Sequence, residues 1–389
     1  MLAAATLPAL GQVGPPVTTG RPTDWTHYRV VFSNPGTLAD ADKKGKADRY
    51  QVLVHDTRFA LQQMRRNPSL RPNPLPGAGP VKDRKPNPNA MHKDWSEPLS
   101  AGLVNPNTSP AKFSFSSTTS SCTSDFVIYP TGIAGSGTSQ ATIVAYNELY
   151  GQNTPTNTGC GSATVTVPTI DWAYNTAFSS AGTSDNSVVK TSPVLSLDGT
   201  QVAFIQVNAS VASLILLKPA TSTTVVPLST ITGPTPNNVA AASYHNCSAP
   251  CMTRLILSGT PNDTWSAPFY DYADDILYVG DDSGTLHKFT TVFDGTPTEV
   301  GSGLTLSSGV KLASPVYDSN PASLKVFVGN VNGVLYSVNA GAMTLSATSF
   351  TLANAAGEGI YDAPLLDPTA EEVYVFVGNS AALGGAHAV

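Results

Sequence analysis

Five aspartates between residues 271 and 282 form the densest group of side chains that could bind a cation. They are Asp271, Asp274, Asp275, Asp281 and Asp282. Hard cations such as Ca²⁺ take several carboxylate and carbonyl oxygens, which closely spaced acids can supply. The spacing matches no EF-hand loop, and aspartate is also a common turn former because its side chain bonds nearby backbone. These residues are therefore candidates for binding calcium, and the alternative is that they only form hairpin turns. No other metal or cofactor is expected.

The four cysteines are the second group with possible chemistry: Cys122, Cys160, Cys247 and Cys251. An even, small number in this type of chain predicts two disulfides and an oxidising compartment. Three pairings are possible; joining Cys122 to Cys160 and Cys247 to Cys251 keeps each pair inside one repeat unit. A metal site at His245, Cys247 and Cys251 is the alternative, but it lacks a fourth ligand.

A polysaccharide hydrolase would need two carboxylates facing one cleft. Four aspartates recur just after the first strand of successive repeat units: Asp198, Asp271, Asp318 and Asp367. Their recurrence favours a role in turns. Six tyrosines could stack on sugars, although their strand positions favour packing: Tyr270, Tyr272, Tyr278, Tyr317, Tyr336 and Tyr361. His287 is expected on a strand face, and no catalytic residue is predicted because no known catalytic motif is present.

The elements that carry these residues repeat along the chain. Gly280, Gly329 and Gly378 are evenly spaced, and each closes a short hydrophobic run. Each run follows a proline and precedes a tight turn, so the units consist of strands and hairpins. The corresponding positions in two longer, earlier units are Pro130 and Gln206. We therefore predict an all-β fold, a β-propeller of at least five units over residues 112–389, with its last blade incomplete.

The residues before the propeller differ in composition. Residues 1–11 resemble the end of a signal peptide, with small residues spaced for cleavage before Gln12. Residues 12–111 are predicted to form an arm with one amphipathic helix near 46–66, a loop over 40–45 and a Pro-rich linker. Basic residues outnumber acidic ones in 1–98, and the reverse holds in 99–389. Three roles of the arm therefore stay open: it lies on the acidic body, it meets an anionic surface, or it is solvated and has no specific partner.

Two of the units resemble known propeller repeats. Pro315-Val316-Tyr317-Asp318 and Val326-Phe327-Val328-Gly329 resemble the repeats of quinoprotein-like and YVTN-type bacterial propellers, and Ser196–Phe204 resembles a TolB-like strand pair. The resemblance implies architecture and a secreted bacterial protein, and no activity. The vicinal cysteines and regular docking tryptophans of quinone-dependent dehydrogenases are missing here, so a quinone cofactor is not expected.

The function predicted from these features is that of a non-enzymatic binding or scaffold propeller, secreted or periplasmic. The sequence does not identify the partner; a glycan and a cell-surface protein are the candidates, and neither a nucleic-acid partner nor a transmembrane segment is expected. Two alternatives stay open. One is a polysaccharide hydrolase or lyase, and the other is a surface-layer or filament protein that assembles through unpaired strand edges.

Overall fold

The structure is a computed structural model. It describes residues 37–55, 59, 108–115, 120–135, 141–150, 160, 168–180, 183–220, 235–259, 263–319, 324–346, 349–353, 359–367 and 371–379. The side chains of 179–180 and 183–184 are not described. The predicted signal-peptide remnant and Pro-rich linker lie outside these residues.

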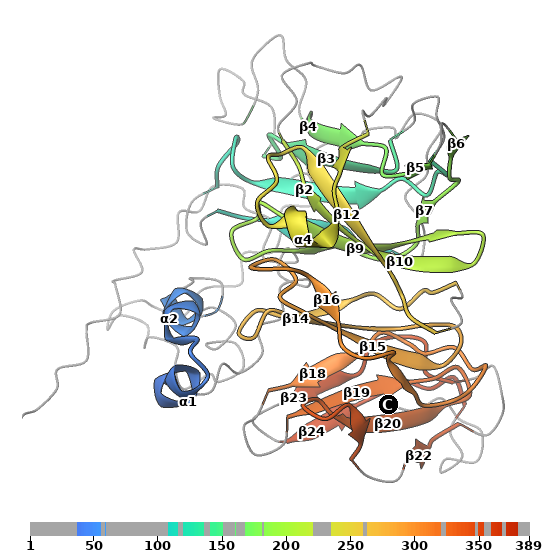
Figure 1. Ribbon diagram of the computed structural model, residues 1–389. Coiled ribbons are helices and arrows are strands. Elements are labelled where there is room, and N and C mark those ends of the chain that lie inside the picture. The colour runs from blue at the N-terminus through green and yellow to red at the C-terminus, as the bar shows by residue number, and fades with distance from the viewer. Residues whose placement is uncertain are drawn as a thin grey trace, which may run out of the picture.

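The body of the chain is an all-β propeller whose described residues form five successive sheets, or blades, which are antiparallel except for the parallel pair β11–β12 in blade 2 (Figure 1). Blade 1 contains β1 (Ala111–Phe113), β2 (Phe126–Pro130), β3 (Ile143–Asn147) and β4 (Thr169–Tyr174). Blade 2 contains β7 (Val188–Val189), β8 (Val194–Leu195), β9 (Val202–Asn208), β10 (Val211–Lys218), β11 (Asn237–Asn238) and β12 (Cys251–Ile256). A short hairpin of β5 (Ser179–Ser180) and β6 (Thr183–Ser184) precedes blade 2, and helix α4 (Ala241–Tyr244) precedes β12.

Blades 3 and 4 follow the same plan, and part of a fifth is described. Blade 3 contains β13 (Phe269–Asp271), β14 (Ile276–Gly280), β15 (Thr285–Thr290), β16 (Thr298–Glu299) and β17 (Leu304–Thr305). Blade 4 contains β18 (Val316–Asp318), β19 (Lys325–Gly329), β20 (Val334–Asn339), β21 (Thr344–Leu345) and β22 (Phe350–Thr351). Blade 5 contains β23 (Leu365–Asp367) and β24 (Glu372–Tyr374). The all-β propeller predicted from the sequence is thus present as a series of sheets.

The blades stack face to face, and hydrophobic cores fill the spaces between them. One cluster joins blade 2 to blade 3 and includes Ile205, Leu214, Leu277 and Phe289, all fully buried. Comparable clusters join blades 1 and 2, blades 3 and 4, and blades 4 and 5. Because blade 2 is covered on both faces, its central strands β9 and β10 read as nearly continuous apolar runs.

The repeated glycines are explained by the chain segment that crosses each blade on its way to the next one. A Cβ atom on Gly280 would lie 2.7 Å from Cβ of Leu312, and one on Gly329 would lie 2.5 Å from Cβ of Ile360. Leu312 belongs to the segment that enters blade 4, and Ile360 to the segment that enters blade 5. Glycine at the end of the second strand therefore lets this connector pack directly on the sheet.

Serines before the blade prolines link neighbouring blades. The Ser192 hydroxyl accepts a hydrogen bond from the backbone N–H of Ser109 (2.8 Å), and the Ser314 hydroxyl accepts one from that of Ala267 (2.8 Å). The first bond joins the connectors that enter blades 1 and 2, and the second joins those that enter blades 3 and 4. The first strands of these blades are also in contact, so they share one side of the stack.

The described part of the arm contains the helices α1 and α2, where a single helix was predicted. Helix α1 (Leu38–Lys43) lies where a loop was expected, so that expectation is wrong. Its N-cap is Thr37, whose side chain accepts from the backbone N–H of Asp40 and explains the helix start. Helix α2 (Ala47–His55) covers the first part of the predicted helix, and most of the remainder lies outside the described residues. Figure 1 shows both helices beside the blades, on the side of β14.

Candidate functional site

The five clustered aspartates lie in two places rather than one. Asp271, Asp274 and Asp275 precede β14, whereas Asp281 and Asp282 follow it. At about 3.3 Å per residue, the strand separates Asp275 from Asp281 by roughly 20 Å along the chain. In the part of the chain that the structure describes, no group of three or more His, Cys, Asp or Glu side chains is arranged to hold a metal ion. The calcium candidates therefore do not converge on one site.

A buried polar network lies at the end of β14. Asp281 follows that strand, His287 lies on β15 and Glu299 ends β16. The imidazole of His287 is fully buried; its Nε2 lies 3.2 Å from Oδ2 of Asp281 and its Nδ1 lies 2.6 Å from Oε1 of Glu299. The hydroxyl of Ser283 donates to Asp281 (2.7 Å) and that of Ser258 donates to Glu299 (2.7 Å). Ser258 follows β12, so the network also ties blade 2 to blade 3.

The electrostatics of this network favour a protonated His287 beside an ionised Asp281. Burial acts to lower the pKa of His287, but hydrogen bonds and Coulomb attraction from Asp281 and Glu299 outweigh it and raise that pKa above its ordinary value. Burial acts to raise the pKa of Asp281, but hydrogen bonds from His287, Thr285 and Ser283 outweigh it and lower that pKa. Both ring nitrogens thus face carboxylates, and neither serine bonds to the ring, so the arrangement is not that of a nucleophile and its base.

We expect the stability of the protein to fall as pH rises through the folded-state pKa of His287. A raised pKa means that the stabilising contribution is complete below the unfolded value of about 6.5 and is lost above the folded value. A neutral imidazole has one N–H and leaves one carboxylate without its donor. Urea midpoints measured from pH 5 to 9 should show this loss in the wild type and a flatter profile in His287→Gln.

The exposed His55 provides the control for this pH dependence. The His55→Gln variant removes a histidine whose ring, among the described residues, bonds the carbonyl of Gln51 in its own helix (2.7 Å). Its profile should run parallel to the wild-type profile. A His287→Gln profile that is also parallel would show that the network does not titrate in this range.

Above the network, charged side chains from neighbouring connectors form what we call the connector rim. It comprises Lys190, Asp263, Trp265, Asp282 and Lys311. Lys190 pairs with Asp263 and its ammonium lies 4.7 Å from the centroid of the Trp265 ring. The backbone N–H of Asp282 donates to the carbonyl of Asp263 (3.1 Å), and its side chain pairs with Lys311 (2.5 Å). These contacts make one continuous row across the entrances to blades 2, 3 and 4.

The rim is accessible to a ligand. The Trp265 side chain is 41% exposed, and the side chains of Lys311 and Asp263 are 51% and 31% exposed. Lys190 and Asp282 are less exposed, at 21% and 10%, so the more accessible member of each pair, Asp263 or Lys311, is the one that a ligand can replace. Burial, followed by the nearby charge of Asp263 and Asp281, raises the pKa of Asp282 against the opposing effect of Lys311. The rim therefore combines a stacking surface with both signs of charge.

The aspartates proposed for a hydrolase recur at the opposite end of the blades. Asp271, Asp318 and Asp367 each end the first strand of blade 3, 4 or 5. Asp271 accepts from the backbone N–H of Ala273 (3.0 Å), and Asp198 accepts from that of Thr200 (3.0 Å). Those two bonds are turn-forming bonds. Of the six tyrosines considered for sugar stacking, five are buried among strands, and Tyr361 is 58% exposed.

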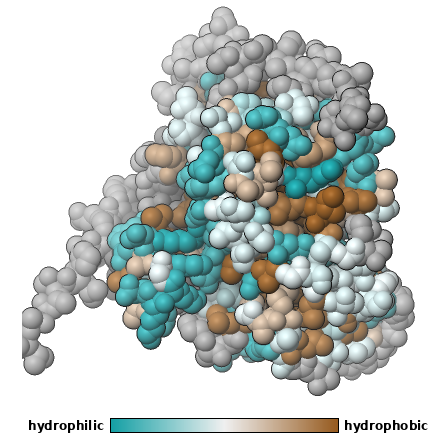
Figure 2. All heavy atoms as spheres, in the orientation of Figure 1, coloured by the Kyte–Doolittle hydropathy of each residue, from teal (hydrophilic) through white to brown (hydrophobic). Residues whose placement is uncertain are grey.

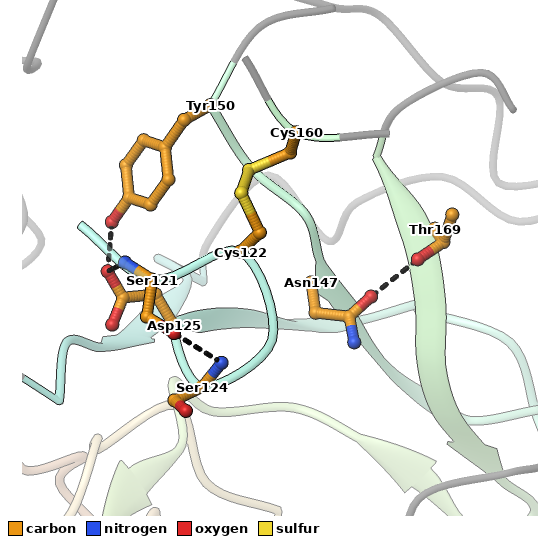
Figure 3. The surroundings of a disulfide bond; sticks show 8 residues. All are labelled: Ser121, Cys122, Ser124, Asp125, Asn147, Tyr150, Cys160 and Thr169. Carbon is orange, nitrogen blue, oxygen red and sulfur yellow. Dashed lines mark hydrogen bonds between the residues drawn. A yellow bond between two sulfur atoms is a disulfide. The ribbon is translucent and has the colours of Figure 1, made fainter. Parts of the chain in front are cut away.

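The cysteines lie in bonding pairs within blades 1 and 2. The sulfur atoms of Cys122 and Cys160 are 1.98 Å apart, and Cys247 is bonded to Cys251. Because their thiols are joined, Cys247 and Cys251 do not form a metal site with His245. Figure 3 shows Cys122 in the loop between β1 and β2, beside Asp125. The carboxylate of Asp125 accepts a hydrogen bond from the hydroxyl of Tyr150. The backbone N–H of Cys160 donates to the carbonyl of Tyr150 (2.9 Å), and both residues lie in the segment between β3 and β4.

Comparisons with known proteins add little beyond the architecture. No protein-family model matches the sequence, and no curated protein matches it significantly. Among solved structures, BamB from Moraxella catarrhalis is 14% identical with a TM-score of 0.29, covering 62% of this chain and 57% of that one. The periplasmic gluconolactonase PpgL of Pseudomonas aeruginosa is 10% identical with a TM-score of 0.31, covering 68% of this chain and 66% of that one. This chain thus spans less than two thirds of the length of either structure.

Sequence reasoning missed most of the rim and the network. Neither Lys190 nor Lys311 was a candidate, and Glu299 and Ser258 were not recognised as partners of His287. One signal was available: Lys190, Trp265 and Tyr361 each stand three residues before the proline that opens a blade. Aligning the units on that proline would have placed these side chains on equivalent connectors.

Proposed function

We propose that the chain is a non-enzymatic binding or scaffold propeller that acts in the periplasm or outside the cell, with the connector rim as its binding face. The observation that carries this proposal is the exposed indole of Trp265, held against Lys190 in a row of exchangeable ion pairs. The two disulfides support an oxidising compartment. In the described residues, no helix is both long and apolar enough to cross a membrane.

A glycan is the ligand class that this chemistry fits. The free part of the indole offers a flat apolar surface for the C–H face of a sugar, and aromatic side chains with polar neighbours are typical of binding hot spots. The carboxylates of Asp263 and Asp282 accept hydrogen bonds from hydroxyl groups, while Lys190 and Lys311 donate to ring or acidic oxygens. The rim thus supplies both requirements of sugar recognition within one row.

The test is binding of the oxidised full chain to an immobilised panel of neutral and acidic polysaccharides. Trp265→Ala should weaken binding at least about tenfold, which corresponds to about 1.4 kcal/mol. Tyr374→Ala is a matched control, because Tyr374 is also 41% exposed but lies on β24 of blade 5. Equal effects of the two substitutions would contradict the rim as the binding face, and capture of a protein instead of a glycan would contradict the ligand class.

The same preparation distinguishes the two alternative functions. Release of reducing ends that Asp271→Asn or Asp318→Asn abolishes would indicate a hydrolase. Concentration-dependent growth into filaments would indicate a structural protein, whereas a monodisperse monomer at high concentration would argue against that function.

A further inference from the structure

The arm docks on the end of blade 3 that lies opposite the rim. Its receiving surface, which we call the shoulder, consists of two turns: Tyr272–Asp275 between β13 and β14, and Val292–Asp294 between β15 and β16. Asp274, Asp275 and Asp294 give the shoulder a negative charge. Figure 2 shows hydrophilic side chains gathered over the region where Figure 1 places α1 and α2. The arm thus presents its polar side to solvent.

Arg49 is the anchor of this contact. Its Nε donates to the carbonyl of Tyr272 (2.6 Å), and its terminal nitrogens contact the hydroxyl of Tyr270 (2.7 Å) and the carboxylate of Asp294. A further nitrogen–oxygen distance of 3.9 Å joins it to Asp275, whose side chain is only 7% exposed. A guanidinium placed between two carboxylates and two neutral acceptors forms a stronger contact than an exposed surface pair.

Two lysines add ionic contacts, and Leu53 and Phe59 add apolar ones. Lys44 and Lys46 each lie 3.3 Å from the carboxylate of Asp274, and Lys46 also donates to its carbonyl (2.9 Å). On the apolar face of α2, Leu53 is 1% exposed and belongs to the cluster that joins blades 2 and 3. That cluster contains Tyr272, whose hydroxyl donates to the carbonyl of Leu195 in blade 2 (2.9 Å). The arm therefore covers one end of the seam between two blades.

Helix α1 is too short to be stable alone, because it has 6 residues and isolated helices need about 12–15 residues to persist in water. Most helical stability in proteins comes from the packing of one face, so α2 also depends on its contacts with the shoulder. These contacts are largely ion pairs, and the lysine side chains are 51% and 39% exposed, so salt weakens them.

We propose that the shoulder is a docking surface for a short basic amphipathic helix and that the chain's own arm occupies it as a releasable strap. The strap folds as it docks, held by Arg49 and by insertion of Leu53. Raising the ionic strength, or removing the charge of Arg49, shifts the arm to an undocked state and uncovers the seam between blades 2 and 3. This device is independent of ligand binding at the rim.

The test is hydrogen–deuterium exchange of the full chain, followed at residues 37–55 and at the shoulder. At 50 mM NaCl the amides of α2 should be protected, and protection should fall at least tenfold in 1 M NaCl while the strands of blade 3 stay protected. Arg49→Gln should have the same effect at low salt. Lys43→Gln is the matched control, because Lys43 is an exposed basic residue in the last turn of α1 and its loss should leave protection unchanged.

Two outcomes would overturn the proposal. Protection of α2 that is insensitive to both salt and Arg49→Gln would make the arm a permanent part of the fold. Absence of protection at low salt would show that the arm does not dock. The wild-type salt series needs no variant, so a folding defect of Arg49→Gln would not prevent a decision. Neither outcome bears on glycan binding, which the Trp265→Ala comparison tests separately.

Discussion

Removing the disulfide between Cys122 and Cys160 is expected to lower the free energy of unfolding by about 4 kcal/mol. The two cysteines are separated by 38 residues, so the bond restricts a long loop in the unfolded chain. In the folded state it joins the loop before β2 to the segment before β4, and thereby holds the outer part of blade 1 together. The double variant Cys122→Ala/Cys160→Ala should therefore unfold at a clearly lower urea concentration.

The second disulfide provides a comparison within the same molecule. Cys247 and Cys251 are separated by only 4 residues, so the chain-entropy relation gives about 2 kcal/mol for their bond. Urea unfolding of both double variants should therefore rank the Cys122–Cys160 bond as the more stabilising. An equal or reversed order would show that native-state packing around Cys251, rather than loop length, sets the contribution. Free thiols in the purified protein would contradict the expected oxidising compartment.

The blades could be predicted from the sequence because their signals are local and repeated. The central hairpins of blades 3 and 4 carry Asp or Asn where the turn starts and glycine where the backbone needs a positive φ, at Gly284 and Gly333. The side chains of Asp281 and Asn330 both accept from backbone N–H groups inside their own turns. The hydrogen bonds that such a side chain makes in its turn depend on residues next to it in the sequence. The interpretation of the aspartates as hairpin formers therefore needed no tertiary information.

The rim and the shoulder could not be predicted because their parts come from distant segments. Lys190 and Asp263 are 73 residues apart and Arg49 and Asp294 are 245 residues apart. The five aspartates that looked like one group are divided because a strand of five residues stands between them. Only the charge asymmetry of the sequence favoured an arm on the body, and it left contact with an anionic surface equally open. Which acids the arm meets depends on how blade 3 positions its turns.

Gly284→Ala is expected to cost about 3 kcal/mol of stability or more. Gly284 has a φ of +89°, where an L-residue with a Cβ is strained. An added Cβ would also lie 1.7 Å from the carbonyl oxygen of Ser307. That carbonyl belongs to the connector toward blade 4. The connector is held against the turn by a hydrogen bond that the backbone N–H of Leu306 donates to the carbonyl of Gly284 (2.8 Å). Because backbone meets backbone, no side-chain rotation relieves the overlap, and overpacking adds to the strain.

Gly341→Ala is the matched control, and its effect should have the opposite sign. Gly341 has no atom within 4 Å of an added Cβ and no positive φ, so alanine there mainly reduces the entropy of the unfolded chain and should stabilise by about 0.4–1 kcal/mol. Thermal and urea unfolding of the two variants measures both effects.

If Gly284→Ala yields no folded protein, Gly329→Ala replaces it, because Ile360 crowds that position. Since the turn at Gly284 also holds Asp281 and Asp282, a folded Gly284→Ala variant should bind glycan less tightly, whereas Gly341→Ala should not. In the structure, a connector passes so close to Gly284 and Gly329 that only glycine fits there. Similar stabilities for all three variants would contradict this close approach.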